Sequence, residues 1–282
     1  MSCYKTILAV FRSPDDADCL CRLACDIANR WQAHLVGFYA RPGLAVHTGL
    51  RGPDLDEWLG QKRRRIEQYN SLIRTAVEQS VLSSGNNWDW REMEDPKEPS
   101  GDTAAEFARC ADLVIIDRLE RGSSLVDPDM TLEQLMFETG RPLLVVPPNC
   151  KAKQVGRRIV VAWNGTRQAS RAAFDALPLM ASHENEAIRL VCPPTPEHGP
   201  NQIAQGAELA ETLARHDVKL EVKALPGRHS DAGAEIMAEC EEFDADLLVM
   251  GAYGHSRLRE YIFGGTTETI LNASTIPVLI SH

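Results

Sequence analysis

Short apolar runs and longer amphipathic stretches alternate along most of this chain. The apolar run 187–191, for example, is followed by 203–216, where apolar residues return every three or four positions. An unbroken apolar run of about four to eight residues is typical of a strand buried on both faces, and the second spacing is typical of an amphipathic helix. The second half therefore predicts strands at 159–162, 187–191, 219–224, 246–250 and 277–280, and helices over 167–180, 203–216, 232–242 and 267–273.

The first half shows the same order of elements with a longer second helix. Its apolar residues recur at spacings of three, four or seven and form one stripe, which consists of Leu55, Trp58, Leu59, Ile66, Tyr69, Ile73, Val77 and Val81. Strands that alternate with helices predict βαβ crossovers and a parallel sheet covered on both faces. The fold class is therefore α/β, with doubly wound parallel sheets of the Rossmann-like or flavodoxin-like type.

The chain also repeats itself. ADLVII at 111–116 matches ADLLVM at 245–250, and RPLLVV at 141–146 matches IPVLIS at 276–281. A chain of 282 residues is long enough for two ordinary domains, each with its own core. We expect two domains in tandem, 1–150 and 151–282, joined by a linker rich in Pro, Lys and Gly.

Charge and hydropathy exclude several classes of partner. Residues 1–150 carry 17 basic and 23 acidic side chains and residues 151–282 carry 13 and 17, so neither half favours nucleic acid. The basic cluster Lys62–Arg65 lies inside a helical pattern and is interpreted as a solvated face. No run of about 18 apolar residues predicts a membrane span. The N-terminus lacks the features of a secretory signal, which predicts a cytoplasmic location.

Three of the eight cysteines lie close together and raise the question of a metal site. Cys19, Cys21 and Cys25 form no CxxC pair and have no histidine nearby in the sequence. We interpret them as small apolar residues packed on a helix and predict no metal. Reduced thiols also fit the cytoplasm.

Glycines gather after the predicted strand 246–250. Gly251 follows it directly and Gly254 comes three residues later, and after nine intervening residues Gly264 stands just before a helix. Glycines let a backbone approach an anion closely, and the free N–H groups at a helix N-terminus favour a phosphate. A loop at the carboxyl end of a parallel strand is also where doubly wound folds bind ligands. The alternative is an ordinary glycine-rich turn.

The spacing Gly-x2-Gly-x9-Gly, followed by a helix and a final Pro-Val-Leu-Ile strand, resembles the ATP-binding loop of the universal stress protein family. The resemblance spans the chain as two consecutive domains of that family, whose fold is adenine nucleotide α-hydrolase-like, and only the second domain keeps the motif. It implies a regulatory, stress-response protein that binds ATP, with or without Mg²⁺. The site that it implies consists of Ala162, Trp163, Asn164, Met250, Gly251, Gly254, His255, Gly264, Gly265, Thr266 and Thr267.

The second half departs from the family pattern at two points. Gly265 stands where a Ser or Thr is usual, with Thr266 next to it, and Asn164 stands where an Asp is usual. Asn can still accept and donate hydrogen bonds to a ribose, and Gly265 still offers its N–H. Thr266 can reach a phosphate or cap the helix. We expect binding with lowered affinity.

The first half has lost the loop. Alignment of the repeats places Asp117, Glu120 and Asp129 opposite the three motif glycines, with Met130 opposite Gly265. Carboxylates near a polyphosphate repel it, and their side chains block close backbone approach. Arg12 stands opposite Asn164 of the second half. We interpret the first domain as a degenerate copy that binds no nucleotide.

No side chain supplies a convincing water-activating group, so we predict no enzyme activity, or at most a slow ATPase. The competing hypothesis is a nucleotide-free scaffold that assembles through its final strands. Residues 141–147 and 276–281 are the final strands of the two repeats, and an edge strand offers unpaired backbone groups. We therefore expect an intramolecular pseudo-dimer of the two domains. A homodimer of such chains and an unidentified protein partner are further hypotheses.

Overall fold

The computed structural model describes residues 3–14, 17–39, 52–85, 87–92, 100–118, 132–148, 150–194, 202–227, 231–252 and 265–282. The chain divides into two compact units. The N-terminal unit is Tyr4–Thr139, and the C-terminal unit includes Gly140–His282. Each is an α/β unit built on parallel strands, as the alternating pattern predicts.

The N-terminal unit holds four parallel strands in the order β3-β2-β1-β4. Helix α1 packs against β1 and α2, and α3 packs against α4. The elements are β1 (Thr6–Phe11), α1 (Ala17–Trp31), β2 (His34–Tyr39), α2 (Pro53–Ser84), β3 (Trp88–Glu92), α3 (Ser100–Arg109), β4 (Leu113–Asp117) and α4 (Leu132–Thr139).

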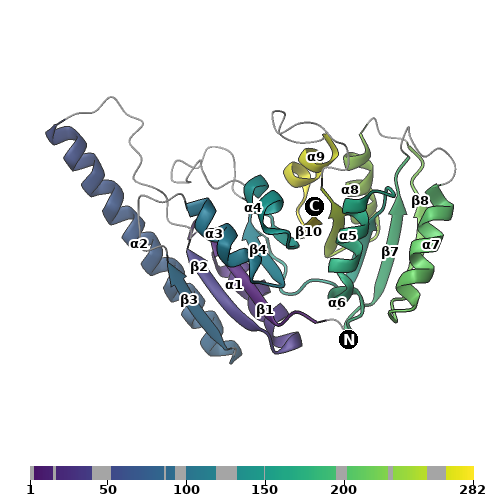
Figure 1. Cartoon of the computed structure of the whole chain (residues 1–282), viewed down its shortest axis with the longest axis horizontal. Helices are drawn as coiled ribbons and strands as arrows, with labels where there is room; N and C mark the ends of the chain where they lie inside the picture. Colours follow the sequence, from purple (N-terminus) through teal and green to yellow (C-terminus); the bar gives the residue numbers. More distant parts are fainter. Residues whose placement is uncertain are drawn as a thin grey trace. The chain divides into compact units, whose positions relative to one another are not determined.

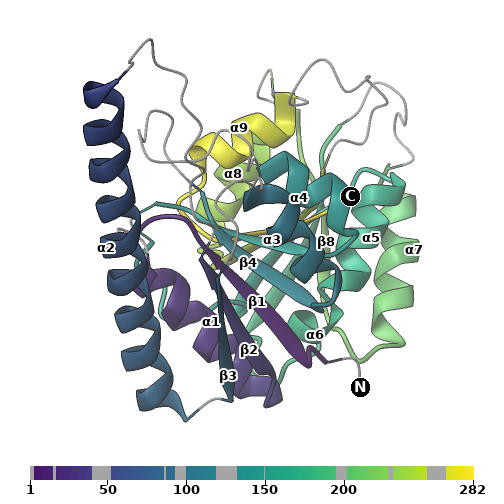
Figure 2. The ribbon, with the colours of Figure 1, turned by 60° about the vertical axis from the view of Figure 1, so that its left-hand side comes forward.

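Helix α2 is much longer than the strands beside it. Its 32 residues span about 48 Å at about 1.5 Å per residue, whereas a strand of six residues spans about 20 Å. The predicted apolar stripe is therefore buried at Ile66, Ile73, Val77 and Val81 and not before Ile66. The N-terminal part of the helix extends beyond the strands of its own unit (Figures 1 and 2).

The C-terminal unit has the strand order β5-β10-β9-β6-β7-β8, in which all neighbours except β5 and β10 run parallel. Helices α5 and α7 lie in front of its strands in Figure 1, and α8 and α9 lie behind them. The elements are β5 (Leu143–Val146), β6 (Arg158–Ala162), α5 (Arg167–Asp175), α6 (Leu177–Met180), β7 (Ala187–Cys192), α7 (Gln202–Ala214), β8 (Glu221–Ala224), α8 (Ala232–Glu242), β9 (Leu247–Gly251), α9 (Gly265–Ala273) and β10 (Val278–Ser281).

The helix predicted over 167–180 is interrupted. It divides at Ala176 into α5 and α6, with Pro178 in the first turn of α6. Proline has no backbone N–H to donate to the preceding turn, so a helix restarts near it more readily than it continues through it.

The final strands of the two repeats pair with each other, as expected. Strand β5 lies antiparallel to β10, with Val145 opposite Val278 and Leu143 opposite Ile280. Because of this pairing, β5 belongs to the C-terminal unit. The compact units therefore divide at Thr139 and Gly140, before the boundary that we predict between the sequence repeats.

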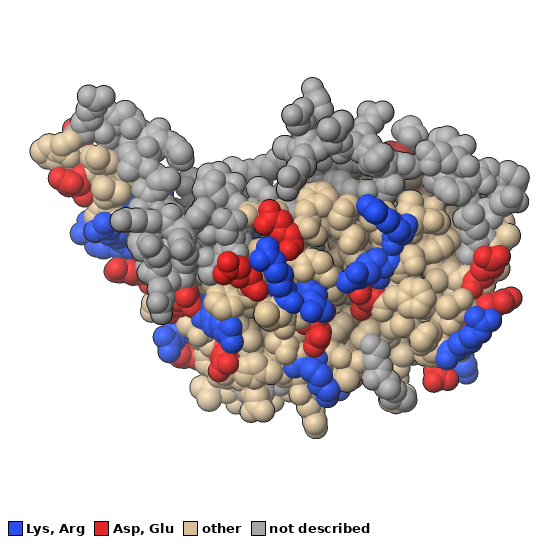
Figure 3. Space-filling view, in the orientation of Figure 1, with Lys and Arg blue, Asp and Glu red and all other residues tan. Residues whose placement is uncertain are grey.

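The described surface is mixed in charge. On the face drawn in Figure 3, basic and acidic side chains alternate and do not gather into one patch of a single sign. Arg63, Arg64 and Arg65 are exposed on α2, which confirms the interpretation of that basic cluster as a solvated face. Within the described residues, no helix combines the length and the apolar character needed to cross a membrane.

Candidate functional site

The chain changes direction across the sheet of the C-terminal unit between β6 and β9. From β6 it proceeds to β7 and β8 on one side, and from β9 it proceeds to β10 on the other. Doubly wound folds bind ligands at the carboxyl ends of the strands that flank such a switch point. Ala162 lies opposite Met250 at these ends, so the two separate parts of the predicted site, 162–164 and 250–251, come together.

Gly251 is needed for packing at the end of β9. A Cβ at this position would lie 2.3 Å from the backbone N of Ala169 and 2.4 Å from the carbonyl carbon of Gln168. Only glycine lets the first turn of α5 approach the strand this closely. The contact with α5 by itself accounts for the glycine, and the approach of a phosphate to Gly251 stays a prediction.

Asn164 caps the turn between β6 and α5. Its Oδ1 accepts hydrogen bonds from the backbone N of Thr166 at 3.3 Å and from Thr166 Oγ1 at 2.7 Å. Thr166 is in turn the N-cap of α5 and accepts from Ala169 N at 3.3 Å. The acceptor of Asn164 is thus engaged, and what it offers to a ribose oxygen is the N–H donors of Nδ2.

Trp163 brings a buried donor to the same strand end. Its backbone N–H donates to the carbonyl oxygen of Val191 at 2.8 Å, which extends the ladder between β6 and β7. Its indole Nε1 is buried and has no hydrogen-bond partner among the described residues. Buried N–H groups are nearly always paired, so an unpaired one at this strand end is a candidate donor to a ligand.

Helix α9 begins at Gly265, and the backbone N–H groups of its first turn have no partners within the helix. A Cβ on Gly265 would meet no atom within 4 Å. Thr266 is the second helical residue and so is not the N-cap, which removes one of the two roles predicted for it. Thr267 is buried in the first turn of α9, with 3% of the residue exposed. Gly254, His255 and Gly264 lie outside the described residues.

The matching position of the N-terminal unit is filled by an ion pair. Val10 of β1 lies opposite Ile116 of β4, just as Ala162 of β6 lies opposite Met250 of β9. The residues that follow, Asp117 and Gly251, therefore occupy matching positions in the two units. Arg12 Nε lies 2.9 Å from Asp117 Oδ1, and both side chains are buried.

A second hydrogen bond joins the Arg12 guanidinium to the carbonyl oxygen of Asp117. The carboxylate that the sequence analysis expects to repel a phosphate is therefore paired with a cation. Arg12 neutralises the carboxylate, and the two side chains occupy the space themselves. Glu120, Asp129 and Met130 lie outside the described residues.

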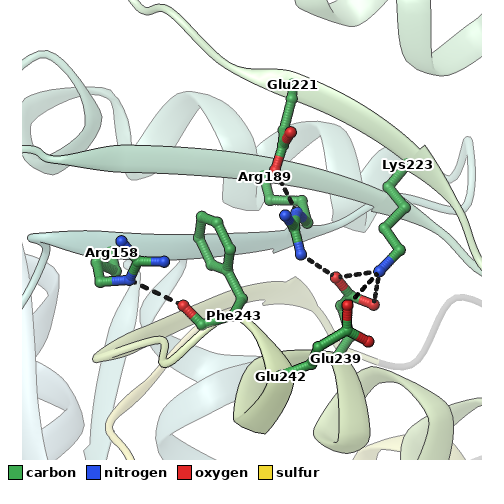
Figure 4. Close-up of polar contacts among 7 residues, drawn as sticks. All are labelled: Arg158, Arg189, Glu221, Lys223, Glu239, Glu242 and Phe243. Carbon is green, nitrogen blue, oxygen red and sulfur yellow. Dashed lines mark hydrogen bonds and ion pairs between the residues drawn. The ribbon is translucent and has the colours of Figure 1, made fainter.

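An ionic cluster ties α8 to the strands on the other side of the switch point (Figure 4). The carboxylate of Glu239, which is 5% exposed, pairs with Arg189 of β7 at 2.5 Å and with Lys223 of β8 at 2.7 Å. Lys223 also contacts Glu242 at 3.2 Å. The hydrogen bond to Glu239 is the main cause that raises the pKa of Lys223. Burial lowers the pKa of Arg189, but its hydrogen bonds to Glu239 and Glu221 outweigh this and raise it.

The cluster was not found from the sequence, because its members are scattered over three elements. Gly233 was also missed, since the sequence does not show which element packs against a glycine that lies inside a helical pattern. Thr166 could have been found, because a Thr directly before a helical pattern is a typical N-cap.

The three neighbouring cysteines pack on α1. Cys19, Cys21 and Cys25 are all buried on this helix, which confirms the packing interpretation. Burial is the main cause that raises the pKa of the Cys21 thiol. Among the described residues, no group of three His, Cys, Asp or Glu side chains is placed to hold a metal ion.

Comparison with known proteins identifies the unit that carries this site. The model of the universal stress protein family matches residues 156–282. The C-terminal half of the chain is thus similar to a universal stress protein domain. A curated universal stress protein from Synechocystis sp. is 30% identical over 151 residues, which are 52% of this chain. The match covers about half, 49%, of that relative's length.

Solved structures extend the likeness to both repeats at the level of the fold. A universal stress protein from Archaeoglobus fulgidus matches 98% of this chain and 97% of its own, with 15% identity and a TM-score of 0.69. A functionally unknown protein from Pseudomonas aeruginosa PAO1 matches 99% and 92%, with 15% identity and a TM-score of 0.63. The tandem α/β architecture is thus one that a universal stress protein structure shares.

Proposed function

We propose that the C-terminal unit of this chain binds one adenine nucleotide, ATP, at the carboxyl ends of β6 and β9. The observation that carries the proposal is the unpaired indole N–H of Trp163, which is buried at the end of β6. The Nδ2 donors of Asn164 follow one residue later, and Gly265 opens α9 on the far side of the loop after β9. The role is regulatory, in a stress response in the cytoplasm.

The groups at this strand end fit the parts of a nucleotide. The first N–H groups of α9 and its positive dipole end would hold phosphate oxygens. Asn164 would donate to the ribose, because its Oδ1 already accepts from Thr166. Trp163 supplies a further donor and an aromatic surface. Mg²⁺, if bound with ATP, would be held by the phosphates, since the described residues hold no cluster for a metal ion.

Calorimetry with ATP on the full chain tests the stoichiometry. We expect one site per chain, because the ion pair of Arg12 and Asp117 fills the matching position of the N-terminal unit. A stoichiometry near two contradicts this asymmetry.

The indole N–H signals test the place of binding. The chain has five Trp residues, and Trp163 alone lies after residue 150 in the sequence. In a ¹H–¹⁵N spectrum, Trp163→Phe assigns its indole signal, and saturating ATP should move that signal more than the other four. ATP binding that leaves it unmoved contradicts the placement of the nucleotide.

A nucleotide-free scaffold is the second candidate, and the pairing of β5 with β10 favours it. In this pairing the two final strands associate with each other within one chain, which supports an assembly role inside the chain, although the paired backbone groups are then not open to another molecule. Mass spectrometry of the freshly purified and denatured protein separates the two functions. Released ATP supports the first. No released nucleotide, together with no calorimetric binding at millimolar ATP, supports the scaffold.

A further inference from the structure

Helices α8 and α9 pack against each other at one glycine. A Cβ on Gly233 would lie 2.9 Å from Thr269 Cβ and 3.0 Å from the carbonyl oxygen of Thr266. Both neighbours belong to the first half of α9, and one of them is backbone. Gly233 has no positive φ that would demand a glycine, so the close contact itself accounts for the residue.

Helix α8 is anchored to the sheet toward its C-terminus and capped at its N-terminus, so it cannot retreat from α9 at low cost. At its N-terminus, Asp231 Oδ1 accepts from the backbone N of Gly233 at 3.1 Å. Toward its C-terminus, Glu239 is bound by Arg189 and Lys223, which lie on β7 and β8 (Figure 4). Breaking such a buried pair leaves a charge without its partner and is strongly unfavourable.

The ring of Phe243 adds a second anchor at the C-terminal end of α8. The guanidinium carbons of Arg158 and Arg189 lie 4.5 Å and 4.2 Å from its centroid. The Nε of Arg158 also donates to the carbonyl oxygen of Phe243 at 2.8 Å. Extra volume at Gly233 would therefore displace the first turn of α9 before it displaced α8.

We infer that Gly233 is a positioning residue that sets where the first turn of α9 stands, and that it thereby controls how tightly the domain holds the phosphates of its nucleotide. The inference rests on the proposed function, because it assigns the N-terminus of α9 to the phosphates. Gly233 touches no ligand in this account. It acts through the backbone at Thr266.

The test compares ATP with adenosine, which has no phosphates. Calorimetry on the full-length Gly233→Ala chain should show ATP affinity reduced roughly tenfold, as expected when binding groups shift by a few tenths of an ångström. Adenosine affinity should stay within about twofold of wild type. A merely structural role would not separate the two ligands.

Gly206→Ala is the matched control. Gly206 lies in α7 of the same unit, and a Cβ there would lie 2.8 Å from Cys192 Sγ and 3.2 Å from Val222 Cγ1. The crowding is similar, but it is directed at β7 and β8. Affinities for ATP and adenosine should both stay at the wild-type values, with the thermal midpoints of both variants recorded alongside.

The outcomes separate the two ideas. Suppose that the wild-type protein binds ATP and that the Gly233→Ala chain is folded. If the variant binds ATP as tightly as wild type, or loses affinity for ATP and adenosine equally, only the positioning role is overturned. Wild-type protein that binds neither ligand overturns the proposed function and this inference with it. If Gly233→Ala does not fold, Glu239→Gln loosens the same support from its other end. It must weaken ATP more than adenosine, and equal effects overturn the inference.

Discussion

The buried ion pair of the N-terminal unit offers the sharpest test of how the two repeats have diverged. We consider Arg12→Met, Asp117→Leu and the double variant. Met keeps most of the length of the Arg side chain, and Leu has the same number and branching of side-chain heavy atoms as Asp, so the changes remove charge without opening a cavity. Each single variant leaves one charge without its ionic partner, and the double variant leaves none.

The magnitude follows from burial. The side chains of Arg12 and Asp117 are 7% and 3% exposed, so water screens neither charge. Removing one member of such a pair typically costs about 3–5 kcal/mol of unfolding free energy, whereas replacing both with apolar residues is often neutral or stabilising. We expect each single variant to lose about 3 kcal/mol and the double variant less than about 1 kcal/mol.

Tryptophan fluorescence during urea unfolding can report on this unit alone. Trp31, Trp58, Trp88 and Trp90 all belong to the N-terminal unit, so a Trp163→Phe background leaves only reporters from that unit. A double-mutant cycle then gives the coupling between the two side chains. If the losses of the two single variants simply add in the double variant, the pair is not the buried, mutually neutralising contact described above.

Three further predictions concern the packing and the chemistry of single residues. Gly251→Ala would force a Cβ against the first turn of α5 and should lower the unfolding free energy by about 3 kcal/mol, measured in urea, and a loss below about 1 kcal/mol would contradict that contact. Asn164→Ala should cost about 1 kcal/mol through the lost cap at Thr166, whereas Asn164→Asp keeps an acceptor there and should leave the thermal midpoint near wild type. Burial and nearby Glu239 raise the pKa of the Cys240 thiol to about 12 from 9.0, so Cys240 should resist a thiol reagent at pH 8 that labels exposed Cys110. The folded state keeps this proton longer than the unfolded state, so stability should fall as pH rises above about 9, and Cys240→Ala should reduce that slope.

The order and type of the elements could be predicted well, because the apolar period of a segment directly reflects which of its faces is buried. The helix expected over 232–242 is α8 at the same bounds, and the pairing of the two final strands follows from their place at the end of each repeat. The spacing of apolar residues in a helix does not show how far the elements that cover its apolar face extend. The stripe predicted along α2 starts at Leu55, for example, whereas its fully buried part begins only at Ile66.

The individual roles at the site could not be predicted in the same way. Gly251 and Gly233 are both glycines because another helix or its backbone touches them, and the touching residues lie far away along the chain. The Oδ1 of Asn164 already accepts a hydrogen bond from Thr166, and the residue types alone do not predict this contact. Spacing placed these residues at the right strand ends, but contact geometry assigned what each of them does.

By itself, the amino-acid sequence determined two α/β repeats, their parallel strands, the loss of the glycine loop in the first and its presence in the second, since these depend on local period and residue type. The tertiary structure alone decided that Arg12 neutralises Asp117, that α5 presses on Gly251, and that a clamped α8 supports the first turn of α9. Each of those contacts joins residues from different elements. The contribution of each contact to the folding free energy depends on burial and on distances of a few ångströms. Neither quantity can be calculated from the order of residues along a chain.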